Sequence, residues 1–173
     1  VAPAMSARQL RKPLALAIHG GAGVIERNAL GADVERAILA DLERVLDAGH
    51  AVLATGGTAL DAVEAAVSML EDMPSFNAGR GSVFTADGRH ELDASIMDGH
   101  GRRAGAVAGV STVRNPVRLA RRVLEDSPHV FLIGEGAEQF ADTQPGIERV
   151  ANDWFDTEGR GEQLRQGPQR EPT

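Results

Sequence analysis

The chain has 173 residues, of which 42% are hydrophobic and 3% aromatic, and its formal net charge is -7. A chain of this length can bury a core of small aliphatic side chains, whereas the lack of cysteine excludes disulfides, thiolate metal sites and a cysteine nucleophile. No apolar run approaches the roughly 20 residues of a membrane span, and the basic residues are too scattered to favour nucleic-acid binding.

The N-terminal region contains one short apolar run. Residues 1–13 are interpreted as an extension without the apolar core of a secretory signal, and a cytoplasmic protein is expected. Residues 14–18 predict a buried strand that ends in a glycine-rich loop. This loop comprises His19, Gly20, Gly21, Ala22 and Gly23. It lacks the spacing of a dinucleotide fingerprint, so we interpret its glycines as sites of close backbone packing and His19 as a hydrogen-bonded structural histidine.

Two helices are predicted next. Apolar residues recur at helical spacing over residues 33–54, and Asp33 is a plausible N-cap. After a break at two glycines, Thr58 caps a second helix with Asp61 in its first turn, where an acidic side chain interacts with the helix dipole. Asp61 therefore receives no catalytic role. The second helix ends before Pro74, because the residue before proline avoids helical geometry.

The segment after this helix, residues 74–82, is irregular and contains Asn77 beside glycines that permit close approach of a ligand. A side-chain amide at such a place can donate a hydrogen bond to a developing oxyanion or a leaving group. The same residue type also satisfies backbone groups of its own turn. Asn77 is the leading candidate for a functional side chain, with this local structural role as the alternative.

The next elements are predicted as strands. Asp87-Gly88 favours a hairpin between residues 82–85 and 90–97. The histidines at 90 and 100 fit no common zinc spacing, and nothing distinguishes an acid from a base in the pair Asp93 and Asp98. The sequence therefore predicts neither a transition-metal site nor a glycosidase pair here.

The C-terminal half continues with alternating elements. Residues 105–110 predict a strand of small residues pressed against a close neighbour, and Asn115-Pro116 predicts a helix start. A buried strand at 130–133 and a short helix at 135–140 follow, and residues from Glu158 onward are interpreted as a flexible tail. We find no Gly-x-Ser-x-Gly elbow and no serine beside a credible His–Asp pair, so the chain has no complete catalytic set of its own.

Several motifs occur in a fixed order along the chain. They are His19-Gly20-Gly21-Ala22-Gly23, Gly56-Gly57-Thr58-Ala59-Leu60-Asp61-Ala62-Val63, Phe76-Asn77-Ala78-Gly79-Arg80-Gly81, Glu91-Leu92-Asp93-Ala94, Met97-Asp98-Gly99, Gly105-Ala106-Val107-Ala108-Gly109-Val110, Asn115-Pro116 and Ser127-Pro128-His129-Val130. In this combination the chain resembles, over about residues 14–155, the α subunit of the plant-type asparaginase/isoaspartyl dipeptidase family. Members of this family are N-terminal-nucleophile hydrolases that use a threonine.

The resemblance implies an α/β fold, namely an αββα four-layer Ntn-hydrolase sandwich that is completed by a separate β subunit. Residues 14–157 would be the α-subunit part of this domain, and residues 158–173 the flexible linker before the site of self-cleavage. The implied assembly is an (αβ)2 heterotetramer that hydrolyses β-aspartyl dipeptides and L-asparagine. The nucleophilic threonine would lie on the β chain, with its own α-amine as the base.

The resemblance also implies the site residues. Asn77 would support the reaction near the substrate amide, and the His19–Gly23 loop would lie beside the active site. A structural Na+ would be bound by main-chain carbonyl oxygens, and no organic cofactor is implied. The carbonyls are those of Leu70, Glu71, Met73, Phe76, Ala78 and Arg80. A hard alkali cation prefers such oxygen ligands, and side-chain identity is nearly irrelevant to them.

Three alternatives stay open. One is a glycosylasparaginase-like amidohydrolase, although the Phe-Asn-Ala-Gly sequence favours the asparaginase/isoaspartyl branch. Another is a non-catalytic α/β domain that binds an anionic ligand through the His19 loop. The last is a purely structural subunit that tolerates substitution at Asn77 and Gly79.

Overall fold

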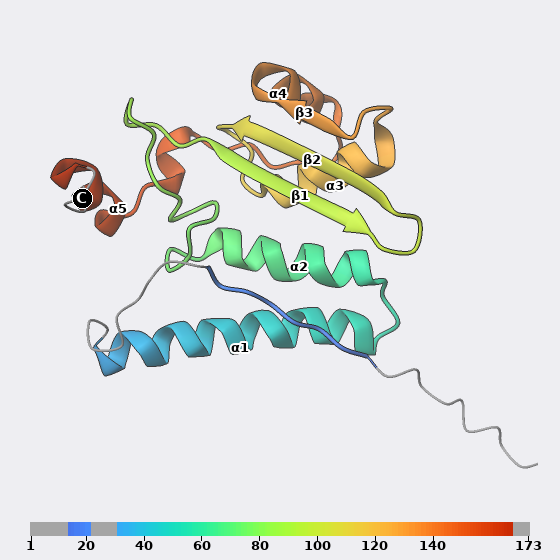
Figure 1. Cartoon of the computed structure of the whole chain (residues 1–173), viewed down its shortest axis with the longest axis horizontal. Coiled ribbons are helices and arrows are strands. Elements are labelled where there is room, and N and C mark those ends of the chain that lie inside the picture. Colours follow the sequence, from blue (N-terminus) through green and yellow to red (C-terminus); the bar gives the residue numbers. More distant parts are fainter. Residues whose placement is uncertain (1–13, 22–30, 168–173) are drawn as a thin grey trace, which may run out of the picture.

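The described residues, 14–21 and 31–167, form a small sheet with helices packed on one of its faces in a computed structural model (Figure 1). The elements in chain order are α1 (Ala32–Ala54), α2 (Ala59–Asp72), β1 (Leu92–Asp98), β2 (Arg103–Val110), α3 (Pro116–Asp126), β3 (Phe131–Ile133), α4 (Gly134–Thr143), the 3-10 turn η1 (Asn152–Phe155) and α5 (Glu158–Gln166). The predicted α/β class is confirmed. None of these helices is both long and apolar enough to cross a bilayer.

The sheet has three strands in the order β1-β2-β3. β1 and β2 are antiparallel, with Ser95 opposite Ala106, and β2 and β3 are parallel, with Val107 opposite Leu132. The predicted strand of small residues at 105–110 is confirmed as most of β2. A Cβ atom on Gly105 would lie 2.2 Å from the carbonyl oxygen of Ala120, so β2 packs directly against the backbone of α3.

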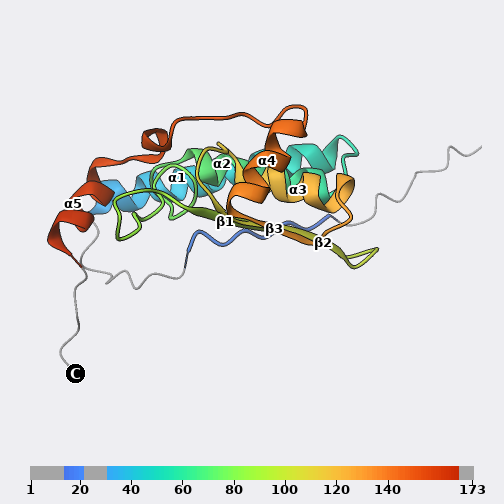
Figure 2. The same ribbon diagram turned by 90° about the horizontal axis from the view of Figure 1, so that it is seen from above.

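The two faces of the sheet differ in what covers them. Helices α1 to α4 lie on one side, and the other side carries none of these helices (Figure 2). Leu92 and Ile96 point toward the helices and are buried, whereas Met97, Phe131 and Ile133 are 60%, 54% and 62% exposed. Alternation along a strand places these three large side chains on the uncovered face. The prediction that residues 130–133 form a strand is confirmed, but the prediction that it is buried is wrong.

The predicted strand at 14–18 is wrong for this chain. These residues form no strand, and Leu14 is half exposed. They run instead along α1 and α2 (Figure 1), where Ile18 packs against a cluster that includes Val45 and Leu70. A strand needs a hydrogen-bonded neighbour, and no described strand lies beside this segment.

The predicted hairpin forms only at its turn. Gly88 donates its N–H to the Thr85 carbonyl at 3.0 Å, but residues 82–85 are not a strand and β1 begins at Leu92. Side chains instead accept hydrogen bonds from backbone N–H groups on both sides of the turn. The Val83 N–H donates to Oδ1 of Asn77, and the His90 N–H donates to Oδ1 of Asn152, both at 3.0 Å. β1 pairs with β2 instead.

The first two helices are confirmed, with one correction to their caps. Thr58 and Asp61 form a reciprocal capping box, and hydrogen bonds from the Thr58 side chain and backbone lower the pKa of Asp61 to about 2. The prediction of Asp33 as the first N-cap is wrong, because α1 begins at Ala32 and its N-cap residue is Gly31, two residues before Asp33.

Two further predictions need correction, one at the start of α3 and one in the C-terminal segment. Asn115 is the N-cap residue of α3, but its side chain does not cap the helix and donates instead to the Ser68 carbonyl at 3.2 Å. The flexible tail expected from Glu158 is wrong for α5, whose first turn is capped by the Thr157 hydroxyl. This local cap signal competes with the polar, glycine-containing composition of the segment.

Candidate active site

A cavity of about 630 Å³ lies where three distant segments of the chain meet. Its lining includes His19, Gly20 and Gly21 from the first segment, Phe76, Asn77 and Ala78 from the second, and Arg160 and Gln163 from α5. This volume lies within the usual range of small-molecule sites. The first two segments touch, because a Cβ atom on Gly20 would lie 3.0 Å from the Phe76 ring. The structure therefore brings the two predicted motifs together, and Ala22 and Gly23 lie outside the described residues.

The loop that carries Asn77 folds back tightly on itself. Gly79 and Gly81 have φ values of 48° and 109°, a region that favours glycine. A Cβ atom on Gly79 would lie 2.3 Å from the Glu71 carbonyl oxygen, and one on Gly81 would lie 2.6 Å from the Pro74 carbonyl oxygen. A side chain at either position would collide with the backbone, so this loop geometry requires glycine at both.

Asn77 is held by its oxygen. Oδ1 accepts a hydrogen bond from the Val83 N–H at 3.0 Å, and the residue is exposed at the cavity. The local structural role considered for this amide is therefore present. The bond fixes the side chain so that the Nδ2 group is the part left to donate to a ligand. The two interpretations of Asn77 are compatible.

His19 has the structural hydrogen bond expected for it. Its Nδ1 atom accepts from the Gly21 N–H at 3.2 Å, which stabilises the turn of the glycine loop. With Nδ1 acting as an acceptor, the neutral ring carries its proton on Nε2. The histidine lines the cavity but shapes the loop rather than standing beside a nucleophile in the described residues.

The carbonyl groups predicted to bind Na+ lie at the end of α2 and in this tight loop. Leu70, Glu71 and Met73 accept hydrogen bonds at their carbonyl oxygens from Met73, Arg80 and Phe76, at 3.2, 2.7 and 3.5 Å. A carbonyl oxygen has two lone pairs, so one such bond leaves room for a cation. No cluster of three His, Cys, Asp or Glu side chains suited to a metal occurs in the described part of the chain. Binding of Na+ by these carbonyls, with those of Phe76, Ala78 and Arg80, stays a prediction.

The Glu71 side chain has a role that the sequence did not predict. It is 3% exposed, and its Oε1 atom accepts from the Val117 N–H at 3.0 Å at the start of α3. Oε2 has no hydrogen-bond partner among the described residues. Burial raises the pKa of Glu71 to about 8, so the carboxyl group is protonated at neutral pH. This side chain connects the end of α2, which precedes the Asn77 loop, to helix α3.

Glu71→Gln should change how stability depends on pH. Between pH 4.5 and about 8 the unfolded carboxyl has lost its proton while the folded one keeps it. Stability from this group is therefore complete below pH 4.5 and falls by about 1.4 kcal/mol per pH unit up to about pH 8. Glutamine has no such proton to lose. Urea unfolding at pH 5, 6.5 and 8 should show the variant gaining on the wild type as the pH rises, whereas parallel curves would contradict the assignment.

A buried serine and histidine form a cluster with an aspartate beside the loop. The Ser82 hydroxyl is 2.9 Å from Nδ1 of His90, and Nε2 of His90 is 3.0 Å from the Asp156 carboxylate. The expectation that no serine meets a His–Asp pair is therefore wrong. Ser82 and His90 are 6% and 0% exposed and do not line the cavity, so this hydroxyl is not accessible to a substrate. The cluster joins the chain near Asp156 to the loop.

The segment before α5 is anchored at several further points. Asn152 donates to the carbonyls of His90 and Ser111 at 2.9 and 2.8 Å, and the Gly81 N–H donates to the Phe155 carbonyl at 3.2 Å. α5 consequently begins beside the Asn77 loop, and Arg160 and Gln163 reach the cavity. Neither residue was predicted, because the polar composition of this region favours a tail, although the Thr157 cap is a local signal of the helix.

Comparison with known proteins gives one consistent result. Residues 12–172 match the family described as Asparaginase. The chain is 52% identical to the isoaspartyl peptidases of Salmonella typhimurium and Escherichia coli K12 over 149 residues, which are 86% of this chain and 47% and 46% of those proteins. It is 42% identical to the isoaspartyl peptidase/L-asparaginase of Homo sapiens over 152 residues, which are 88% of this chain and 47% of that protein. The chain spans about half the length of these curated relatives.

Proposed function

This chain belongs to the asparaginase family, which it matches over residues 12–172, and we propose that it is the α subunit of an isoaspartyl peptidase/L-asparaginase. The enzyme would hydrolyse β-aspartyl dipeptides and L-asparagine in the cytoplasm. The observation that carries the proposal is the exposed Asn77 amide, whose oxygen is fixed by Val83 at the cavity where the two glycine loops meet. The relatives named isoaspartyl peptidase support the reaction class.

The reaction divides between two chains. The hydroxyl of a threonine at the N-terminus of the β chain attacks the side-chain amide carbonyl of the substrate, and the α-amine of that threonine takes the proton. The leaving amine receives this proton, and water then hydrolyses the aspartyl ester. The present chain contributes binding and orientation: the Nδ2 group of Asn77 donates to the reacting group, and the His19 loop forms the adjacent wall.

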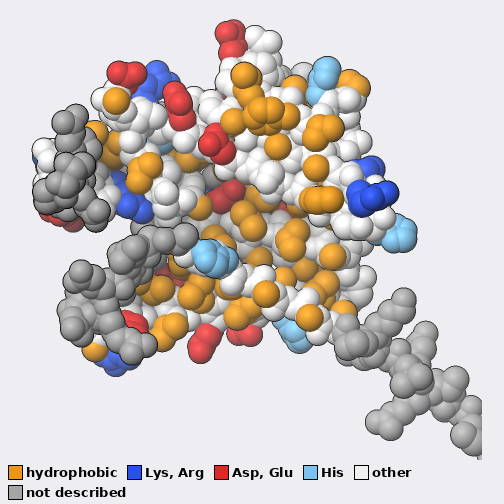
Figure 3. Space-filling view, viewed as in Figure 1, with side chains coloured by type: hydrophobic (Ala, Val, Ile, Leu, Met, Phe, Trp, Pro, Cys, Tyr) orange, Lys and Arg blue, Asp and Glu red, His pale blue; other side chains and the backbone are white. Residues whose placement is uncertain are grey.

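A β subunit also accounts for the uncovered sheet face. Figure 3 shows hydrophobic side chains gathered over the strands on this side. Met97 in β1 and Phe131 and Ile133 in β3 are among the large hydrophobic side chains that are exposed. The relatives are about twice as long as the matched region, so a second half of similar size is available to cover it. We propose that a sheet of the β subunit packs here to complete the αββα four-layer sandwich, in an (αβ)2 heterotetramer. Residues 158–173 would lead to the site of self-cleavage.

Sodium is proposed as a structural ligand of the tight loop, and its removal should lower thermal stability. At a Na+ concentration of about 100 times Kd, binding adds about 2.7 kcal/mol to the stability of the folded state. Exchange of NaCl for choline chloride at equal ionic strength should therefore lower the Tm by several degrees, and added NaCl should restore it. Identical melting curves in the two salts would remove Na+ from the structure.

Intact mass measurement and N-terminal sequencing of the purified full-length protein test the proposal. We expect two stoichiometric chains, one that contains the present sequence and a second that begins with threonine. A single uncut species that is folded and monodisperse would reject the subunit assignment. It would favour the α/β domain that binds an anionic ligand without turnover.

A further inference from the structure

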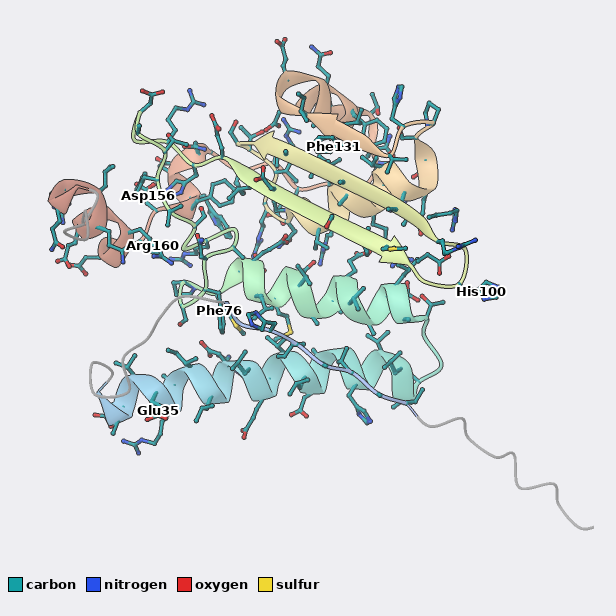
Figure 4. The ribbon with its side chains drawn as sticks, viewed as in Figure 1. Glu35, Phe76, His100, Phe131, Asp156 and Arg160 are labelled. Carbon is teal, nitrogen blue, oxygen red and sulfur yellow. The ribbon has the colours of Figure 1, made fainter. Side chains whose placement is uncertain are left out.

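Helix α5 places a cation at the cavity that Asn77 lines. The Nε atom of Arg160 donates to the Gly81 carbonyl at 2.7 Å, and Nη1 donates to Oε1 of Gln163 at 2.8 Å. In Figure 4, Arg160 lies between α5 and the loop that carries Phe76. The guanidinium group is therefore fixed in position rather than extended into solvent.

The charge of this guanidinium is not neutralised by its bonding partners. A backbone carbonyl and a side-chain amide oxygen are both uncharged, and the lining of the cavity in the described residues contains no Asp or Glu. Arginine has five N–H groups, so several remain after these two bonds. The cavity is thus suited to an anionic group, above all a carboxylate, which a guanidinium binds with two parallel hydrogen bonds.

The backbone before Arg160 holds it in place without a ligand. Both backbone groups of Gly81 are hydrogen-bonded to this region. Its N–H donates to the Phe155 carbonyl, and its carbonyl accepts from Nε of Arg160. The bond between His90 and Asp156 fixes the residue that immediately precedes the helix cap. A preorganised side chain loses little freedom when it binds, which favours a role in recognition.

We propose that Arg160 determines specificity for dipeptides by binding the carboxylate of the leaving amino acid. This inference rests on the proposed function. In a β-aspartyl dipeptide the carbon attached to the scissile nitrogen carries a carboxylate, whereas L-asparagine releases ammonia and has no group at that place. Arg160 therefore contacts one substrate and not the other, while Asn77 serves the amide that both share.

The test compares Arg160→Gln with the wild type in the fully processed enzyme, with β-aspartyl-leucine and L-asparagine as substrates. We expect kcat/KM for the dipeptide to fall about 10- to 100-fold, mainly through KM, because a charge-assisted hydrogen bond is lost. Turnover of L-asparagine should stay within about twofold. Arg160→Lys keeps the charge but lacks the forked arrangement of donors. Its kcat/KM for the dipeptide should therefore lie between those of the wild type and Arg160→Gln.

Arg165→Gln is the matched control, since Arg165 lies on the same helix, is exposed and does not line the cavity. It should change neither substrate. Equal losses for both substrates in Arg160→Gln, or no loss for either, would overturn the assignment. Should Arg160→Gln fail to process, the same two substrates are compared with Arg160→Lys. A loss for the dipeptide alone would then support the assignment, and equal losses or no loss would overturn it. A processed wild type that hydrolyses neither substrate would instead reject the proposed function, and this inference with it.

Discussion

Asn77→Ala lowers kcat by about 10- to 1000-fold in the processed enzyme, the expected scale for loss of one donor to a developing charge. The physical reason is the asymmetry of this amide. Its oxygen is already used by the Val83 N–H, so the Nδ2 group is the part that can act on the substrate. Steady-state kinetics with L-asparagine measure the effect, and a thermal melt establishes that the fold is retained.

Asn77→Asp separates the two roles of the residue. A carboxylate still accepts from the Val83 N–H but has no proton to donate, so the loop is kept while the donor is lost. We expect this variant to melt like the wild type and to be about as slow as Asn77→Ala. Full activity in Asn77→Asp with loss in Asn77→Ala would assign the residue to loop support. Unchanged kinetics in both variants would remove Asn77 from the mechanism.

The parts of the fold that the sequence predicted are those decided by neighbours in the chain. The Thr58 cap with Asp61 in the first turn, the helix stop before Pro74 and the helix start at Pro116 each depend on a few adjacent residues. The strand of small residues around Gly105 was predicted because glycine and alanine permit a close approach whatever the neighbour is.

The failed predictions depend on partners far along the chain. The segment 82–85 has a strand-like pattern, but one of its N–H groups donates to the Asn77 side chain. On the other side of the turn, the His90 N–H donates to the side chain of Asn152, which is 62 residues away. Likewise, Asp156 meets His90 across 66 residues. No spacing rule finds such pairs. Residues 14–18 illustrate the converse, since a strand pattern forms no strand without a partner beside it.

The candidate site was partly predictable for the same reason. Asn77 and the His19 loop were found because glycine-rich motifs surround them, and the structure places both at one cavity. Arg160 carries no comparable local signal, because one arginine in a polar segment is usually solvated. Arg160 is a candidate because the contacts of Phe155 in η1 and of Asp156 hold the start of α5 beside the loop.

Gly105→Ala is expected to destabilise the protein by about 3 kcal/mol, at the upper end of the cost of overpacking, which lowers the Tm by about 10 °C. A Cβ atom at this position would lie 2.2 Å from the Ala120 carbonyl oxygen and 2.4 Å from the Leu124 nitrogen. Both atoms belong to the backbone of α3, so no side-chain rotation relieves the contact and the helix itself must move. Thermal melts of the processed enzyme measure the effect.

Gly136→Ala is the control, and it should raise the stability that Gly105→Ala lowers. Apart from its chain neighbours and the backbone of its own helix, no atom lies within 4 Å of a Cβ at Gly136 in α4, and alanine favours a helix over glycine by about 0.5–1 kcal/mol. If Gly105→Ala melted at the same temperature as the wild type, α3 could move away from β2 without loss of stability. Movement of α3 should also reach the cavity, because the Val117 N–H at its start holds the Glu71 side chain, and the Glu71 carbonyl holds the loop of Asn77. The destabilised variant should therefore lose kcat at temperatures where it is still folded, whereas Gly136→Ala should not.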